Sequence, residues 1–273
     1  MEQRRIAFIG AGNMTKSIIS GLVNNGYPAN LITASNPSTG KLVALQSELA
    51  INTTQDNNQA VSSADVVVLA VKPQLMQQVC AEFAKSCDLN DKLFVSIAAG
   101  INTSRLKEML GGELAVVRTM PNTPSALGLG MTGLFADDLV SQASKQFAGE
   151  LMSMVGKIAW VEEESMINSV IAAAGSSPAY FFLFLEAMQK EAENQGFDHA
   201  TARLLVQQAM LGAAEMVCHN PQLELTELRT QVTSKGGTTA QAINSFQDQG
   251  LEKIVATAMQ AAVTRAEQMA EQF

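Results

Sequence analysis

Two glycine-containing segments combine residue types that can bind anionic ligands. The first is Ile9-Gly10-Ala11-Gly12-Asn13-Met14, which ends the apolar run 6–9 and opens a helical pattern. Gly10 permits a tight turn, and Gly12 lets a phosphate approach the free N–H groups at a helix N-terminus. This order predicts a dinucleotide-binding turn at the start of a βαβ unit. An ordinary strand–helix turn is the alternative, because a glycine pattern alone has low specificity.

The residues after the second predicted strand bear on the choice of cofactor. An NAD site usually has Asp or Glu about 20 residues beyond the glycines, where it binds the ribose hydroxyls. Here no acidic residue occurs between Glu2 and Glu48, and the strand leads into Asn36-Pro37-Ser38-Thr39, with Lys41 following. Amide, hydroxyl and ammonium donors suit a 2′-phosphate, so the segment predicts NADP(H). The same residues can also serve only as turn and N-cap residues.

Three further loops follow predicted strands and are expected at the same edge of a parallel sheet. They are Ala70-Val71-Lys72-Pro73, Ile97-Ala98-Ala99-Gly100 and the segment 118–124. Ligands of open α/β sheets bind beyond the carboxyl ends of the strands. Small residues in these loops leave space for a nicotinamide ribose.

The second glycine-containing segment is Ser234-Lys235-Gly236-Gly237-Thr238-Thr239, between two helical patterns. Its glycines leave backbone N–H groups accessible, hydroxyls flank them, and a helix begins at about Thr238. Such a segment can hold a carboxylate. A helix–helix loop with an N-cap threonine is the alternative that the residues leave open.

The elements that position these segments follow from the hydrophobic patterns. β-rich runs alternate with helical patterns up to about residue 161, and helical patterns dominate from Glu162 onward. We therefore expect an α/β fold: a doubly wound, mostly parallel sheet over residues 1–161, followed by an all-helical domain over residues 162–273. The expected strands are 5–9, 31–35, 65–71, 92–97, 114–118, 131–136 and 157–161. The expected helices are 13–24, 39–49, 74–85, 141–154, 165–174, 178–195, 199–218, 225–232, 238–247 and 251–272.

Composition excludes several classes of function. The 273 residues carry a formal net charge of −8, all of it on residues 162–273, which disfavours nucleic acid and anionic membranes as partners. Three cysteines without a CxxC pair and only two histidines predict neither a disulfide framework nor a metal site. The longest apolar run is 179–185 and no signal pattern precedes residue 6, so we expect no membrane span and a cytoplasmic protein.

In their order along the whole chain, five segments resemble the pyrroline-5-carboxylate reductase family, the oxidoreductases of the last step of proline synthesis. They are Gly10–Met14, Ala70–Pro73, Met120–Pro124, Gly175–Tyr180 and Val232–Thr239. The resemblance implies a Rossmann domain followed by a helical dimerisation domain that interleaves with that of a partner copy. It also implies a homo-oligomer of higher order, such as a decamer, and reduction of 1-pyrroline-5-carboxylate to L-proline with NADPH or NADH.

The resemblance also assigns residues by position. Thr239 would be the catalytic residue, with its hydroxyl near the ring nitrogen. The substrate would contact Ser234, Gly236, Gly237, Thr238, Thr239, Glu164 and Gln231. The dinucleotide would contact Ile9, Gly10, Ala11, Gly12, Asn13, Met14, Asn36, Asn57, Ala70, Val71, Lys72, Pro73, Ile97, Ala98 and Ala99.

The chain departs from the family pattern at three positions. Lys235 stands where many relatives have proline, Gln231 where some have asparagine, and Thr15 where alanine is usual. None of these departures removes a group that the implied chemistry needs.

Two other functions fit part of the pattern. A β-hydroxyacid dehydrogenase also joins a Rossmann domain to helices, but uses a lysine on a helix of the second domain. The only lysines of that half are Lys190, Lys235 and Lys253. A non-catalytic NADP-sensing protein would need only the first glycine segment.

Overall fold

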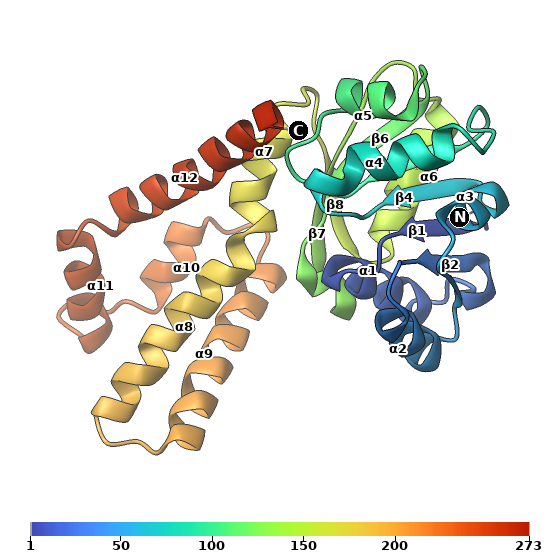
Figure 1. Ribbon diagram of the computed structural model, residues 1–273. Helices are drawn as coiled ribbons and strands as arrows, with labels where there is room; N and C mark the ends of the chain where they lie inside the picture. Colours follow the sequence, from blue (N-terminus) through green and yellow to red (C-terminus); the bar gives the residue numbers. More distant parts are fainter. Residues whose placement is uncertain (1, 273) are drawn as a thin grey trace. The chain divides into compact units, whose positions relative to one another are not determined.

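A computed structural model of the chain describes residues 2–272 (Figure 1). The described residues form two compact units. The first comprises the chain up to Pro178 together with the chain from Ala261 onward, and the second comprises Ala179–Gln260. The α/β class and the order of a sheet-containing half followed by a helical half are confirmed.

The first unit is built on an eight-stranded sheet in the order β3-β2-β1-β4-β5-β6-β7-β8. The strands are β1 (Ile6–Ile9), β2 (Ile32–Ser35), β3 (Asn52–Thr54), β4 (Val66–Leu69), β5 (Leu93–Ser96), β6 (Ala115–Met120), β7 (Gly130–Ala136) and β8 (Gly156–Trp160). All neighbouring strands pair parallel except β6 and β7. The connection between those two is the short 3-10 segment η2 (Thr123–Leu127), which lacks the length of a parallel crossover.

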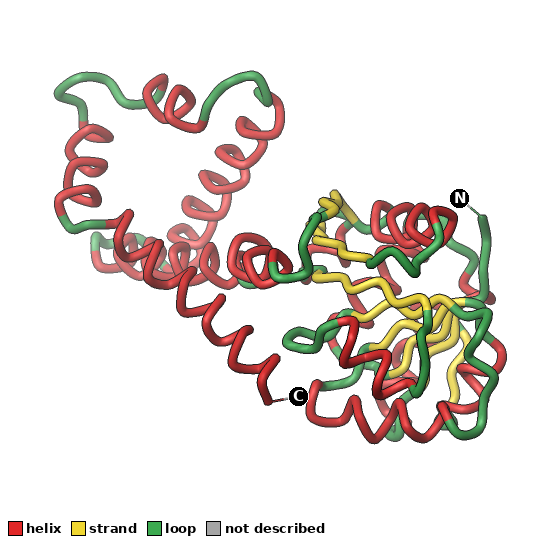
Figure 2. Tube along the Cα trace, turned by 90° about the horizontal axis from the view of Figure 1, so that it is seen from above, coloured by secondary structure: helices red, strands yellow, loops and turns green. Residues whose placement is uncertain are grey.

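Helices cover both faces of this sheet (Figure 2). The helices α1 (Asn13–Asn24), α2 (Thr39–Leu49) and α6 (Gln142–Ser153) contribute to one hydrophobic cluster. The helices α3 (Asn57–Ser63), α4 (Pro73–Ala84) and α5 (Thr103–Leu110) contribute to a second cluster on the other face. Side chains of β1 alternate between the clusters: Ile6 and Phe8 lie in the first, Ala7 and Ile9 in the second. A strand buried on both faces explains the continuous apolar runs of the sequence.

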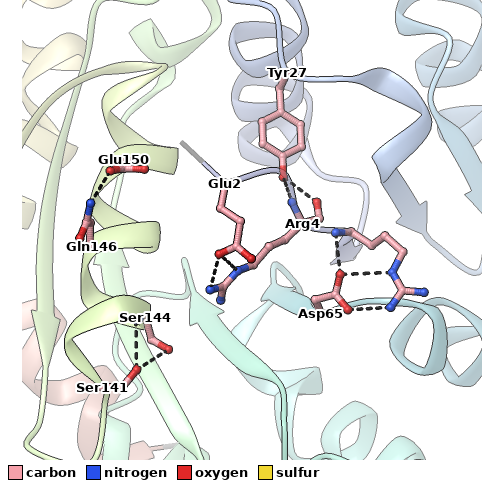
Figure 3. A network of polar contacts seen from close by, with 9 residues as sticks. Glu2, Arg4, Tyr27, Asp65, Ser141, Ser144, Gln146 and Glu150 are labelled. Carbon is pink, nitrogen blue, oxygen red and sulfur yellow. Dashed lines mark hydrogen bonds and ion pairs between the residues drawn. The ribbon is translucent and has the colours of Figure 1, made fainter.

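Polar contacts fix the chain ahead of β1 (Figure 3). The backbone N–H of Arg5 donates to Asp65 Oδ2 at 2.9 Å, and the Arg5 guanidinium pairs with Oδ1 at 2.6 Å. This guanidinium holds the pKa of the Asp65 carboxyl below its usual range. The Tyr27 hydroxyl accepts from the N–H of Arg4 at 3.1 Å and donates to its carbonyl at 2.6 Å. These bonds set where β1 begins, and thereby the position of the glycine turn at its other end.

The second unit contains most of α8 (Ser177–Asn194), then α9 (His199–His219), α10 (Leu225–Gln231), α11 (Thr238–Asp248) and the beginning of α12 (Leu251–Gln272). Among the described residues of this unit, the only buried side chains are Ala202, Val206 and Leu228. Phe184 and Phe246 pack their rings 5.9 Å apart. Most other large apolar side chains of this unit are exposed in the single chain, such as Phe182 at 63%.

One long helical stretch runs from Met166 to Asn194 through α7 (Met166–Val170), the π-helical segment η3 (Ile171–Gly175) and α8. By length and composition alone this stretch could cross a membrane, and 11% of its most apolar window is buried in the chain. The longest apolar run, 179–185, is only part of this stretch, because helical structure also extends through α7 and η3, with a bend at Ser176 before α8. Apolar length of this kind is also what a helix needs to pair with another subunit.

The contacts of α7 explain where the first unit ends. A Cβ added to Gly133 of β7 would lie 2.7 Å from Val170 Cγ1, so α7 packs directly on the sheet. The first compact unit therefore extends past residue 161 to Pro178, and it also includes the end of α12. The expected boundary of the functional domains at residue 161 stays a prediction.

Candidate active site

The turn after β1 has the geometry that its glycines predict. Gly10 has a φ of 109°, and a Cβ placed on it would lie 2.6 Å from the Ala70 carbonyl oxygen. Gly12 faces open space, with nothing within 4 Å of a Cβ built there. Gly10 is thus required by the backbone, whereas Gly12 leaves room for a ligand to approach the chain.

The structure gives a role to Thr15, which stands where alanine is usual in the family. Its hydroxyl is buried and donates to the Gly10 carbonyl oxygen at 2.8 Å. This bond ties the first turn of α1 to the glycine turn. Ile18 and Ile19 of the same helix are fully buried, so the larger side chain does not prevent α1 from packing on the sheet.

Backbone bonds join three of the predicted cofactor segments at one edge of the sheet. The N–H of Gly10 donates to the Ser35 carbonyl at 2.8 Å. The N–H of Ala70 donates to the Ile9 carbonyl at 2.9 Å, and that of Ile97 to the Leu69 carbonyl at 3.2 Å. The structure thereby brings together the segments 9–14, 70–73 and 97–99.

Two asparagines extend this edge toward β2. Asn36 Oδ1 accepts from the Ala11 N–H at 3.3 Å, and its Nδ2 donates to Ser38 Oγ at 2.8 Å. Asn57 Oδ1 accepts from Ser35 Oγ at 2.7 Å. Both predicted positions therefore lie beside the glycine turn, and Asn36 links that turn to the N-terminus of α2.

The helices differ in whether a side chain caps their N-termini, and α4 and α7 (Met166–Val170) are among those without such a cap. Side chains cap α3, α5, α6 and α9, through Asp56, Asn102, Ser141 and Asp198. No side chain caps α1, α2 or α11, and none of these three has an acidic residue in its first turn. Their N–H groups and dipoles thus remain available to an anion.

The loop before α11, which is expected to hold a carboxylate, is a turn in which one of the expected donors is already bonded. Gly236 has a φ of 73°, and the N–H of Gly237 donates to the Ser234 carbonyl at 3.0 Å. Since this bond closes the turn, the donors left for a carboxylate are the N–H groups of Gly236 and of Thr238 and Thr239 in the first turn of α11. The expected contribution of the Gly237 N–H is therefore taken up inside the loop. Thr239 and Ser234 are exposed, as is Gln231 at the end of α10.

Glu164 lies in the first unit and is already bound there. Its carboxylate accepts from the N–H of Thr103 at 2.7 Å and from the Thr103 hydroxyl at 2.9 Å. It also forms an ion pair with Arg118 at 3.1 Å, and that guanidinium is almost completely buried. Burial holds the pKa of Arg118 below its ordinary value, and the Glu164 carboxylate opposes this shift.

The sequence did not predict this ion pair. Arg118 lies in the segment 118–124, which is expected beyond the carboxyl ends of the strands. Its partner Glu164 is 46 residues away in the sequence. A usable signal was the arginine at the end of a buried strand, since a buried guanidinium needs a carboxylate. The dinucleotide positions and Glu164 thus belong to the first unit, whereas Ser234, Thr239 and Gln231 belong to the second.

Comparison with known proteins decides the family. The model for pyrroline-5-carboxylate reductase dimerisation matches residues 164–269, and the model for NADP oxidoreductase, coenzyme F420-dependent, matches residues 5–100. A curated pyrroline-5-carboxylate reductase of Vibrio alginolyticus is 61% identical over 100% of both chains. The chain belongs to the pyrroline-5-carboxylate reductase family.

Solved structures of the family have the same fold. A pyrroline-5-carboxylate reductase from Coxiella burnetii is 42% identical with a TM-score of 0.90, over 98% of this chain and 99% of that one. The Plasmodium falciparum enzyme, solved with NADP bound, is 26% identical with a TM-score of 0.89, over 99% of both chains. The expected oxidoreductase class is confirmed, and the dimerisation match supports self-association of the helical half.

Proposed function

We propose that this chain reduces 1-pyrroline-5-carboxylate to L-proline, with NADPH as the preferred hydride donor and NADH as a possible one. The observation that carries this proposal is the identity of 61% over the whole chain with a pyrroline-5-carboxylate reductase. The open glycine turn and the loop before α11 support it from the geometry. Its place would be the last step of proline biosynthesis.

The residues present fit a dinucleotide. The open space at Gly12 and the uncapped N-terminus of α1 suit a pyrophosphate. Asn36, Ser38 and the exposed Lys41 offer neutral or positive groups to a 2′-phosphate, which is why we propose a preference for NADPH. The other dinucleotide positions are Ile9, Gly10, Ala11, Asn13, Met14, Asn57, Ala70, Val71, Lys72, Pro73, Ile97, Ala98 and Ala99.

The proposed reaction does not need a strong general acid from the protein. Reduction of the ring C=N places a hydride on carbon and a proton on nitrogen, and a protonated imine is already a strong electrophile. The bound dinucleotide supplies the hydride. The chain's own part is positioning, which can contribute several kcal/mol to lowering the barrier.

The substrate would be held at the loop before α11. The N–H groups of Gly236, Thr238 and Thr239 and the hydroxyl of Ser234 would bind its carboxylate, with Gly237 shaping the turn. The Thr239 hydroxyl would orient the ring nitrogen or pass a proton to it by a hydrogen bond. Gln231 and Glu164 complete the proposed substrate residues. For Glu164 this requires that the carboxylate exchange or share the bonds it makes to Thr103 and Arg118.

A β-hydroxyacid dehydrogenase is one of the two alternative functions, and it can be tested separately. A 3-hydroxyisobutyrate dehydrogenase of Mycobacterium tuberculosis shares the fold with a TM-score of 0.50 at 17% identity, which bears on the fold alone. Of the three lysines of the helical half, only Lys235 lies in the loop proposed to hold the substrate, so a lysine-dependent mechanism at this loop would use Lys235. In such an enzyme Lys235→Ala should abolish nearly all activity. In a pyrroline-5-carboxylate reductase the same substitution should lower the activity only mildly.

The helical half is proposed to assemble into a dimer and then a larger homo-oligomer, such as a decamer, in the cytoplasm. The apolar stretch 166–194 lies wholly within the dimerisation match, so a partner subunit rather than a membrane would cover it. Neither nucleic acid nor a membrane is proposed as a partner.

The deciding experiment is turnover. Purified chain is mixed with NADPH and 1-pyrroline-5-carboxylate, and loss of the NADPH absorbance is followed together with formation of proline. Oxidation of NADPH with proline as the product supports the proposal. Binding of NADPH without turnover would favour the non-catalytic alternative.

A further inference from the structure

The last turns of α12 pack against a loop that the proposed cofactor site uses. Gly100 follows the segment 97–99 and is buried, with a φ of 76°. A Cβ placed on Gly100 would lie 2.5 Å from Met269 Cβ and 3.3 Å from the Met269 carbonyl carbon. The helix backbone therefore contacts the loop backbone so closely that even a methyl group does not fit between them.

The same contact continues along α5. Asn102 and Ser104 at the start of α5 line one small surface cavity together with Ala270 and Gln272 at the end of α12. The end of α12 and the 97–104 segment belong to the same compact unit, although α12 begins in the other unit. The packing of Met269 against Gly100 is thus a contact within the first unit.

The inner side of this loop is anchored independently of α12. Ile97 donates its N–H to the Leu69 carbonyl at 3.2 Å, and Ala98 donates its N–H to Ser96 Oγ at 3.3 Å. Ala98 and Ile101 are buried at 6% and 1% exposure in the cluster beneath. Between these two anchors Gly100 has no side chain of its own to hold it. On the α12 side Met269 covers it with its main chain and Cβ and also with the end of its side chain, whose Cε lies 3.4 Å from a Cβ placed on Gly100.

We infer that Met269 is a positioning residue: it holds the loop Ile97–Gly100 in the conformation that receives the dinucleotide. This inference rests on the proposed function, which places residues 97–99 against the cofactor. It makes the C-terminal turn of α12 part of the cofactor site without any contact between Met269 and the cofactor. A loop with freer backbone pays more entropy when the dinucleotide binds, so loss of Met269 weakens binding.

The test compares Met269→Ala with Met269→Leu, and Glu267→Ala on the exposed side of the same turn is the matched control. The dissociation constant of NADPH is measured by titration calorimetry without substrate, and a melting curve is recorded for each variant. Met269→Ala keeps Cβ but removes the rest of the side chain, including Cε, which lies 3.4 Å from a Cβ placed on Gly100. It should raise this constant about 3- to 10-fold. Met269→Leu should restore most of the affinity, because it refills the volume against Gly100. Glu267→Ala should bind as the unchanged chain does.

Gly100→Ala is the second variant, since it disturbs the same contact from the loop side and should also weaken NADPH binding. A Met269→Ala protein with a lower melting temperature but unchanged NADPH affinity would overturn the inference, because Met269 would then only stabilise the fold. If the unchanged chain itself does not bind NADPH, the proposed function is wrong as well. If it binds and Met269→Ala binds equally, only the role of Met269 is wrong.

Discussion

Thr239 and Ser234 occupy one loop but have different proposed partners, and this difference can be measured. Thr239 is assigned to the reacting nitrogen, so Thr239→Ala should lower kcat more than it raises KM. We expect a loss of about 10- to 100-fold, or roughly 1.4–2.7 kcal/mol, for one transition-state hydrogen bond. Ser234→Ala should mainly raise KM for the imine, because the carboxylate keeps its charge throughout the reaction. Steady-state kinetics of both variants check this split.

The control for Thr239 is its place in the first turn of α11. Gly237 is the N-cap there, and no side chain caps the helix. Thr239→Ser keeps the hydroxyl and should retain most of the turnover. Unchanged kcat in Thr239→Ala, with a lowered melting temperature, would mean that the residue serves only the helix.

Asn36 tests the choice of cofactor at the same scale. Its Oδ1 accepts from Ala11 and its Nδ2 donates to Ser38, so Asn36→Asp keeps the first bond and loses the second. The new carboxylate would repel the 2′-phosphate of NADPH. In NADH it would instead accept a hydrogen bond from the ribose hydroxyl. The KM of NADPH should rise more than that of NADH. Equal changes for the two cofactors would show that Asn36 does not face the 2′ position.

At the scale of elements, the loop before α11 depends on its two glycines for different reasons. Gly236 has a φ of 73°, so an alanine there is strained by about 1 kcal/mol or more. Gly237 has ordinary backbone angles, but a Cβ on it would lie 2.6 Å from Ser234 Oγ. Both Gly236→Ala and Gly237→Ala should therefore lower kcat and raise KM.

Gly196 provides the matched control, because it also has a positive φ, of 106°, with open space around its Cβ position. It lies in the turn between α8 and α9. Gly196→Ala should lower the melting temperature by a similar amount and leave kcat and KM unchanged. Activity losses of equal size in all three variants would show that general destabilisation causes them.

Most elements were predictable because apolar periodicity defines them. Helix α5 was missed although Leu106, Met109 and Leu110 give it a buried apolar face, whereas β3 and α3 lack such a pattern. The residues Asn52-Thr53-Thr54 of β3 form a strand only because the backbone of β2 offers a pairing edge. The polar helix α3 depends on the Asp56 cap, whose side chain accepts from two N–H groups. The antiparallel pairing of β7 is likewise a result of a short connection, which strand patterns do not reveal.

The candidate site was predictable only in its local parts. Glycines, hydroxyls and strand ends carry short-range signals, so the segments 9–14 and 234–239 could be found from the sequence. The contacts of Gly100 with Met269 and of Arg118 with Glu164 join residues far apart in the chain. The place of Arg118 at the end of a buried strand indicates that it needs a carboxylate, but no local pattern marks the partner in either contact. Which residues support a loop is decided by packing, and packing is what the sequence patterns leave out.

At the scale of the whole molecule, the helical unit cannot cover its own apolar surface. Phe181, Phe182 and Leu183 are each at least 60% exposed in the single chain. Exposure of several adjacent large apolar side chains is typical of a subunit interface. The match of residues 164–269 to a dimerisation model points to the same surface.

This predicts that one charge placed on α8 disrupts assembly. Phe182→Asp should shift the protein from an oligomer to smaller species in sedimentation velocity at micromolar concentration, because an unpaired carboxylate would be buried in the interface. Val43→Asp is the control, since Val43 is similarly exposed at 62% but lies on α2 of the other unit. It should leave the sedimentation unchanged. An unchanged chain that sediments as a monomer would contradict the prediction, and so would a Phe182→Asp variant that assembles normally, because α8 would then not form the interface.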